Sequence, residues 1–118
     1  MNTDFKQTWD KYTSAWKMTD KAARLTAFSD VLAANAIYTD PLVQTRSWDE
    51  LIGYMENFHQ QIPGGHFVTT YFLAHHQKSI ANWEMKSGEG ITLGTGTSYG
   101  EYDDQGKLLS MNGFFKSE

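Results

Sequence analysis

The sequence of 118 residues contains no cysteine, which excludes a disulfide framework and a thiolate metal site. The absence fits a reducing compartment, so we expect a cytoplasmic protein. The first residues lack the charged-then-apolar pattern of a secretion signal. No apolar run approaches the length of a membrane span, and no membrane partner is expected.

Positive charge is also sparse. Ten Lys and Arg stand against fourteen Asp and Glu, and the basic residues form no patch, so nucleic acid is not an expected partner. No histidine spacing matches a known zinc pattern, and we expect neither a metal nor a cofactor. His75 and His76 are adjacent on a predicted strand, so one of them should face its concave side. That residue could act as an acid or base, or lie at the strand end with its tip in water.

Aromatic residues are abundant, at 14% of the chain with four Trp. In a small domain they either fill the core or line a cavity. Residues 4–17 are predicted to form a helix, because four aromatic side chains recur there at helical spacing: Phe5, Trp9, Tyr12 and Trp16. Core packing explains this stripe, but Tyr12 or Trp16 could also offer a polar tip to a cavity.

A second helix is predicted from Lys21 to Ala34, followed by a short strand that ends at Asp40. Pro41 biases Asp40 away from the helical region of backbone space. An acid at a strand end among apolar and aromatic residues has two explanations. It starts a turn, or it points into a hollow and handles a proton. Arg46 follows closely and could pair with Asp40 or lie at the surface.

A third helix is predicted after Ser47, which forms a capping box with Glu50. Each of the two side chains is expected to bond the backbone N–H of the other residue. Pro63-Gly64-Gly65 ends this helix. Its apolar face comprises Trp48, Leu51, Ile52, Met55, Phe58 and Ile62.

The remaining residues show the alternation of strands, which we predict at 66–76, 79–87, 91–102 and 107–115. The intervening turns are expected at 77–78, 88–90 and 103–106. On the strand over 91–102, glycines share one face, which indicates a bend, a helix or a ligand close against it. On the strand before it, Trp83 could line a pocket or belong to the core.

Helices first and antiparallel strands last predict an α+β fold, with helices covering one face of a curved sheet. The other face still carries apolar and aromatic side chains. We therefore expect a homodimer through this outer sheet face. The residues concerned are Thr95, Thr97, Tyr99, Asn112 and Phe114.

Three stretches in this order resemble the nuclear transport factor 2-like superfamily, in its SnoaL-like and ketosteroid isomerase-like branch. They are Ile37-Tyr38-Thr39-Asp40-Pro41, the capped helix over 47–62, and residues 102–111 with the following Phe114-Phe115. The resemblance covers essentially the whole chain as one domain, 1–118. It implies a cone-shaped α+β barrel, in which three helices of the N-terminal half pack on a strongly curved antiparallel sheet around a pocket.

The resemblance also implies roles for single residues. In ketosteroid isomerase-like members, the acid of the Asp-Pro pair is a general base that moves a proton beside a carbonyl, and Asp40 falls on that position. A Tyr of the first helix serves there as an oxyanion donor; here Trp16 falls near it, with Tyr12 one turn earlier. A second, protonated Asp shares that role, and its position is Ser98. This departure leaves the oxyanion hole of the family incomplete.

We therefore predict Asp40, Tyr12 and Ser98 as catalytic residues. The predicted ligand-binding residues are Trp16, Tyr38, Phe58, Trp83, Met111 and Phe115. Together they describe a pocket for a small apolar molecule. The protein would be an isomerase, cyclase or dehydratase that uses Asp40 as general base on an apolar carbonyl compound. The alternatives are a non-catalytic module that binds a hydrophobic ligand and a dimerisation domain with a vestigial pocket.

Overall fold

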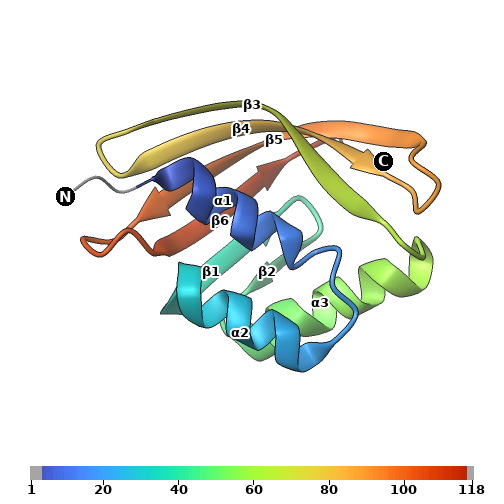
Figure 1. Cartoon of the computed structure of the whole chain (residues 1–118), viewed down its shortest axis with the longest axis horizontal. Helices are drawn as coiled ribbons and strands as arrows, with labels where there is room; N and C mark the ends of the chain where they lie inside the picture. Colours follow the sequence, from blue (N-terminus) through green and yellow to red (C-terminus); the bar gives the residue numbers. More distant parts are fainter. Residues whose placement is uncertain (1–3, 117–118) are drawn as a thin grey trace.

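The computed structural model describes residues 4–116. Figure 1 shows the long strands curving over α1, with α2 and α3 on the same side of the sheet. No helix of the described part is long and apolar enough to cross a membrane. The elements are α1 (Phe5–Ser14), α2 (Lys21–Val31), β1 (Leu32–Asp40), β2 (Val43–Thr45), α3 (Trp48–Gln61), β3 (His66–His75), β4 (Lys78–Lys86), β5 (Thr92–Tyr102) and β6 (Leu108–Phe114).

The six strands form one sheet in the order β2-β1-β6-β5-β4-β3. The predicted α+β class, with three helices on a curved sheet, is confirmed. One detail differs, because β1 and β6 run parallel and the sheet is mixed rather than wholly antiparallel. The hairpins β3-β4, β4-β5 and β5-β6 return the chain beside β1 in the same direction. The order of elements along the chain predicts antiparallel pairing only for strands joined by a hairpin, and β1 and β6 are not joined in this way.

Each helix begins at a side chain that caps its N-terminus, as predicted for Ser47. Asp4 accepts a hydrogen bond from the backbone N–H of Gln7, and Asp20 accepts one from Ala23. The Ser47 hydroxyl likewise accepts from the N–H of Glu50 at 3.1 Å. The second half of the predicted capping box is wrong. The Glu50 side chain accepts from the N–H of Arg46 at 2.8 Å, because it extends one residue beyond the cap.

The second helix is shorter than predicted. It ends at Val31 rather than Ala34, and Leu32 already has extended backbone angles, with φ −110° and ψ 140°. Leu32 pairs with Leu108 of β6, and both side chains are buried. This pairing with a distant strand overrides the helix propensity of the following alanines. As a result β1 is a strand of 9 residues, with Asp40 at its end.

The first hairpin turn lies one residue earlier than predicted. His76 and Gln77 form it with positive φ angles of 47° and 62°, and Lys78 pairs with His75. A two-residue turn of this kind usually carries Asn or Gly. Neither is present, so no local signal marks the position of this turn. The turn after β5 is as predicted, and Gly106 supplies its positive φ of 83°.

The core lies between the helices and the inner face of the sheet. Trp9, Tyr12 and Trp16 of the aromatic stripe are all buried there. A Cβ atom at Gly100 of β5 would lie 3.3 Å from the Trp9 ring, which confirms that a helix packs closely on the glycine face. The largest fully buried side chains are Trp9, Arg24, Phe28, Leu32, Met55, Leu108 and Met111.

Candidate functional site

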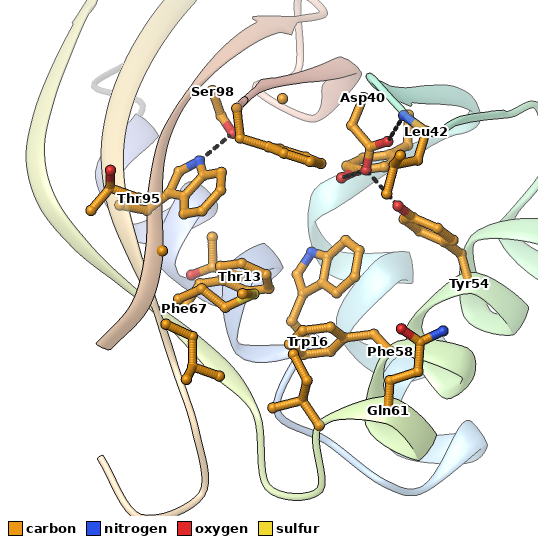
Figure 2. A pocket seen from close by; sticks show the side chains of 18 of the residues that line it. Thr13, Trp16, Asp40, Leu42, Tyr54, Phe58, Gln61, Phe67, Thr95 and Ser98 are labelled. Carbon is orange, nitrogen blue, oxygen red and sulfur yellow. Dashed lines mark hydrogen bonds between the residues drawn. The ribbon is translucent and has the colours of Figure 1, made fainter. Parts of the chain in front are cut away.

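A cavity of about 420 Å³ lies between α1, α3 and the inner face of the sheet (Figure 2). Its volume suits a small organic molecule. Among the lining residues that the structure describes, Asp40 is the only acid and Lys116 is the only base. The aromatic lining residues are Trp9, Tyr12, Trp16, Tyr38, Tyr54, Phe58, Phe67, Trp83 and Phe115.

Asp40 both starts a turn and faces the cavity, so the turn does not exclude a role in the cavity. Its Oδ1 accepts hydrogen bonds from the backbone N–H groups of Leu42 at 2.8 Å and Val43 at 3.1 Å. This is the turn chemistry expected of Asp before Pro. The side chain is 8% exposed and lines the cavity. The turn therefore fixes the carboxyl group in the cavity wall.

The second oxygen of Asp40 meets two phenols. Oδ2 accepts from the hydroxyl of Tyr38 at 2.6 Å and from that of Tyr54 at 2.8 Å (Figure 2). Together with the two backbone donors, these bonds engage the roughly four lone-pair sites of an ionised carboxylate. Short bonds from neutral donors to a charged acceptor are strong ones.

These tyrosines are held in the neutral, donating form. Burial raises the pKa of Tyr38, and the charges of Tyr12 and Asp40 raise it further. Burial likewise raises the pKa of Tyr54, with its hydrogen bond to Asp40 adding to the effect. Both phenols therefore donate to Asp40 near neutral pH.

Trp16 was predicted near the position of the family's oxyanion donor, with Tyr12 one turn earlier. The side chains of these two residues contact each other. The Trp16 indole N–H donates to the Tyr12 hydroxyl at 3.1 Å, inside the core. Burial raises the pKa of Tyr12, although the bond from Trp16 opposes the rise. The Trp16 ring packs edge-on against Tyr54 and Phe58, at centroid distances of 5.9 and 5.7 Å. It thus forms the central wall of the cavity.

Ser98 carries a hydroxyl that is poised to donate. Its Oγ accepts from the indole N–H of Trp83 at 3.0 Å, and among residues 4–116 its own hydrogen has no acceptor. Trp83 lies flat over Gly96, where any side chain would collide with the indole. Gly96 therefore allows Trp83 to reach Ser98.

Asp40 and Ser98 lie on either side of Gly113. A Cβ atom at Gly113 would lie 3.4 Å from Cβ of Asp40, 3.7 Å from the Tyr38 hydroxyl and 3.9 Å from Oγ of Ser98. The absent side chain leaves a niche in the cavity wall between an acceptor and a donor. A polar group of a ligand placed over Gly113 could reach both.

The structure brings nearly all predicted site residues to this cavity. Asp40, Tyr12 and Ser98 line it, as do five of the predicted ligand-binding residues: Trp16, Tyr38, Phe58, Trp83 and Phe115. Met111 does not; it is 1% exposed and belongs to the core. It shares a strand face with Gly113 but pairs with Gly100, deeper beneath α1.

Sequence reasoning missed Tyr54, although it contacts Asp40 directly. A signal existed, because Tyr54, Phe58 and Gln61 recur at helical spacing beside the predicted apolar stripe of α3. The other lining residues that were not predicted are Trp9, Thr13, Leu42, Asn57, Gln61, Ile62, Phe67, Met85, Leu93, Gly94, Thr95, Gly113 and Lys116.

Other candidates lie away from the cavity. His75 and His76 are exposed at the hairpin end, with ring nitrogens 3.1 Å apart, so the expectation that one faces the concave side is wrong. The shifted turn is the reason, because it takes His76 out of the strand. Arg46 is exposed and donates to the Gln44 side chain rather than to Asp40. In the described part of the chain, no three His, Asp or Glu side chains cluster as metal ligands would.

Comparison with known proteins agrees with this fold. The SnoaL-like domain family matches residues 9–111. A proposed isomerase of that family from Agrobacterium tumefaciens is 24% identical, with a TM-score of 0.86 over 96% of this chain and 97% of that one. A proposed SnoaL-like polyketide cyclase from Jannaschia is 9% identical, with a TM-score of 0.76 over 97% and 90% of the two chains.

An NTF2-like protein of unknown function from Cytophaga hutchinsonii is 11% identical, with a TM-score of 0.72 over 98% of this chain and 93% of that one. No curated protein matches the sequence. At these identities the solved structures establish the nuclear transport factor 2-like fold and do not transfer an activity.

Proposed function

Since the chain belongs to the SnoaL-like family, we propose that it is an enzyme that moves a proton on a small apolar carbonyl compound, as an isomerase, cyclase or dehydratase. Asp40 is the general base. The observation that carries this proposal is the single carboxylate in the wall of an aromatic cavity, held by four neutral donors. A fixed acceptor in an apolar site is suited to proton abstraction.

In this mechanism the substrate lies over Gly113, between Asp40 and Ser98. When the Tyr54 hydroxyl moves off Oδ2 of Asp40, this oxygen takes a proton from the carbon beside the carbonyl, so that a C–H bond breaks and an O–H bond forms. The electron pair moves to the carbonyl oxygen, which accepts a hydrogen bond from Ser98. The Trp83 indole donates to Ser98, and such a chain strengthens the Ser98 hydroxyl as a donor. Asp40 then returns the proton to a different carbon, which gives the isomer. In a cyclisation the enolate carbon instead attacks a second carbonyl group, and the alkoxide that forms takes the proton from Asp40. In a dehydration the β-hydroxyl group takes that proton and leaves as water.

The aromatic walls contribute by excluding water from the enolate. Trp16, Phe58 and Phe67 form a contiguous set of rings, with centroid distances from 5.2 to 5.7 Å. Charge that develops in such a site is weakly screened, so the Ser98 hydrogen bond acts more strongly there than in water. The walls also select an apolar, flat substrate.

The proposal is tested by hydrogen exchange in deuterated water. A panel of apolar ketones and β-keto esters is incubated with the protein, and loss of the C–H signal beside the carbonyl is followed by NMR. At least one compound should exchange faster than without protein, and Asp40→Asn should slow that exchange by about 100-fold or more. Asp49→Asn, at an exposed acid on α3, is the control and should exchange normally. Exchange at the uncatalysed rate throughout the panel would contradict the proposal.

A second candidate is a non-catalytic module that binds a hydrophobic ligand. The hydrogen bonding of Asp40 favours it, because the four donors leave no lone pair of the carboxylate vacant. Under this alternative, panel compounds bind by calorimetry and no exchange occurs. Asp40→Asn then leaves their affinity for the cavity largely unchanged.

A further inference from the structure

Tyr54 occupies an acceptor site on Asp40 that faces the cavity. We propose that its phenol hydroxyl occupies the position that a hydroxyl group of the ligand takes when the ligand binds. The cavity then takes a flat, neutral molecule with a phenolic or enolic O–H group, which donates to Oδ2 of Asp40 when the Tyr54 hydroxyl leaves. This inference rests on the proposed function in taking Asp40 as the polar anchor of the site, but it concerns binding and not turnover.

The first step is that only one donor to Asp40 is exchangeable. Oδ1 is bound by backbone N–H groups of the turn after β1, which cannot move without breaking the turn. Tyr38 and Tyr54 both reach Oδ2 through their side chains, but they differ in burial. Tyr38 is only 9% exposed, so the surrounding core confines its ring, whereas Tyr54 on α3 is half-buried. A change of its rotamer frees Oδ2 and leaves the backbone unchanged.

The second step is that the freed acceptor faces the cavity. Tyr54 and Asp40 both line it, and Figure 2 shows their side chains pointing toward each other from α3 and the end of β1. A ligand that displaces the Tyr54 hydroxyl therefore meets Oδ2 directly. It must bring a donor of its own, because an ionised carboxylate only accepts hydrogen bonds.

The third step concerns the charge of the ligand. All four groups bound to Asp40 are neutral, and Asp40 is the only acid in the lining. An anionic ligand would face the carboxylate at short range in an apolar site, where like charges repel strongly. A neutral O–H donor meets no such repulsion and reproduces the bond that Tyr54 gives up.

The fourth step concerns the shape of the ligand. The rings of Trp16, Tyr38 and Tyr54 pack around the same point, with centroid distances from 5.6 to 5.9 Å. Together these rings present an aromatic surface to the cavity, against which a flat ring of a ligand packs favourably. An enol and its ketone lose their proton to give the same enolate, so a ligand of this class is consistent with a base at Asp40.

The test uses three biphenyls of one shape: 4-phenylphenol, 4-methoxybiphenyl and biphenyl-4-carboxylate. Calorimetry gives their affinities for the wild type, Tyr54→Phe, Tyr38→Phe and Asp40→Asn. The phenol should bind the wild type more tightly than the ether, and the carboxylate most weakly. Tyr54→Phe should tighten binding of the phenol by roughly threefold to tenfold, the free energy of about one net hydrogen bond, and leave the ether unchanged.

Two variants serve as matched controls. Tyr38→Phe also removes a donor to Oδ2, but at a buried position on the strand, so it should not tighten binding of the phenol. Asp40→Asn should abolish the preference for the phenol over the ether. Equal binding of phenol and ether by the wild type and Tyr54→Phe, or weaker binding of the phenol by Tyr54→Phe, would overturn the inference. Circular dichroism checks that each variant is folded.

These outcomes are separable from those of the exchange experiment. A protein that shows the predicted phenol preference but exchanges no ketone contradicts the proposed reaction and supports this inference. A protein that exchanges ketones but binds phenol and ether equally supports the proposed reaction and contradicts this inference.

Discussion

Tyr38 and Asp40 stand two residues apart on β1, and the Tyr38 hydroxyl donates a 2.6 Å hydrogen bond to Oδ2 of Asp40. Side chains alternate along a strand, so residues two apart share a face. The acid and one of its donors are therefore presented to the cavity together by the geometry of a single strand. The short sequence Tyr-Thr-Asp at the end of β1 is sufficient to place both groups.

The hydrogen bond from Tyr38 should contribute to stability. Tyr38→Phe leaves a buried carboxylate with one donor fewer, and we expect the free energy of unfolding to fall by about 1.5–3 kcal/mol. Urea unfolding at neutral pH measures it. Tyr71→Phe is the matched control: among residues 4–116 the Tyr71 hydroxyl makes no hydrogen bond, and the substitution keeps the ring on the outer sheet face. It should change stability by about 0.5 kcal/mol at most. Equal losses in the two variants would contradict a stabilising role for the Tyr38–Asp40 bond.

Two glycines of β5 should differ sharply in their tolerance of a side chain. A Cβ atom at Gly96 would collide with the Trp83 indole and lie 2.8 Å from the carbonyl oxygen of Phe114, whereas one at Gly94 meets only the end of Met85, at 3.9 Å. Gly96→Ala should therefore destabilise the fold by about 1–3 kcal/mol and displace Trp83 from Ser98. Gly94→Ala should be close to neutral. Thermal unfolding and the tryptophan emission spectrum measure the two effects, and similar behaviour of both variants would contradict the packing described.

Buried tyrosines should make the fold sensitive to alkali. Burial raises the pKa of Tyr102 to about 12, and it also raises the pKa values of Tyr12, Tyr38 and Tyr54. In the unfolded chain a tyrosine loses its proton near pH 10. Above that pH the folded state binds more protons than the unfolded state, so stability falls as pH rises. The contribution of Tyr102 should be fully present below about pH 10 and lost between about pH 10 and 12.

Urea unfolding at several values between pH 8 and 11 measures this dependence. Tyr102→Phe removes one of the four groups and should flatten the decline above pH 10. A free energy of unfolding that stays constant up to pH 11 in the wild type would contradict the burial of these phenols.

The outer face of the sheet is the remaining apolar surface, and we propose that a second copy of the chain covers it. Exposed apolar residues from neighbouring strands lie there: Val68, Tyr71, Leu73, Ile80 and Phe114. The patch continues across β3 to β6, and two identical patches can pair about a twofold axis. Sedimentation should show a dimer at micromolar concentration.

Ile80→Lys should dissociate that dimer, because Ile80 lies in the middle of the patch, between Leu73 and Tyr99. Ile91→Lys is the matched control: Ile91 is equally an exposed isoleucine, but it lies outside the strands, just before β5. A monomeric wild type, or a dimer that survives Ile80→Lys, would argue against this interface.

Much of the fold was predictable because its signals are local. Caps at Asp20 and Ser47, the Pro-Gly-Gly stop after α3 and the alternation along β4 each act within a few residues. The predictions that were wrong concern features that contacts between distant residues determine. The end of α2 depends on the pairing of Leu32 with Leu108, and the parallel direction of β6 follows from the path of the whole chain.

The site was predictable in part for the same reason. Asp40 stands at a strand end marked by Pro41, whereas Ser98 was indicated only by the resemblance to ketosteroid isomerase-like proteins, counted back from the hairpin turn. Tyr54 was missed because helical spacing identifies the buried face of a helix. It does not show which residue at the border of that face lines a cavity. Met111 was predicted to line the cavity but lies in the core, two residues before Gly113 on β6, since the depth of the cavity depends on how α1 leans on β5.

The most direct test of the account compares Asp40→Asn with the wild type on one carbonyl compound that both proteins bind. Calorimetry first establishes equal occupancy, and NMR in deuterated water then gives the rate of exchange beside the carbonyl at saturation. The account predicts a rate lower by about 100-fold to 10,000-fold in Asp40→Asn, because the atom that accepts the proton is lost. Equal rates at equal occupancy would contradict the assignment of Asp40 as the base.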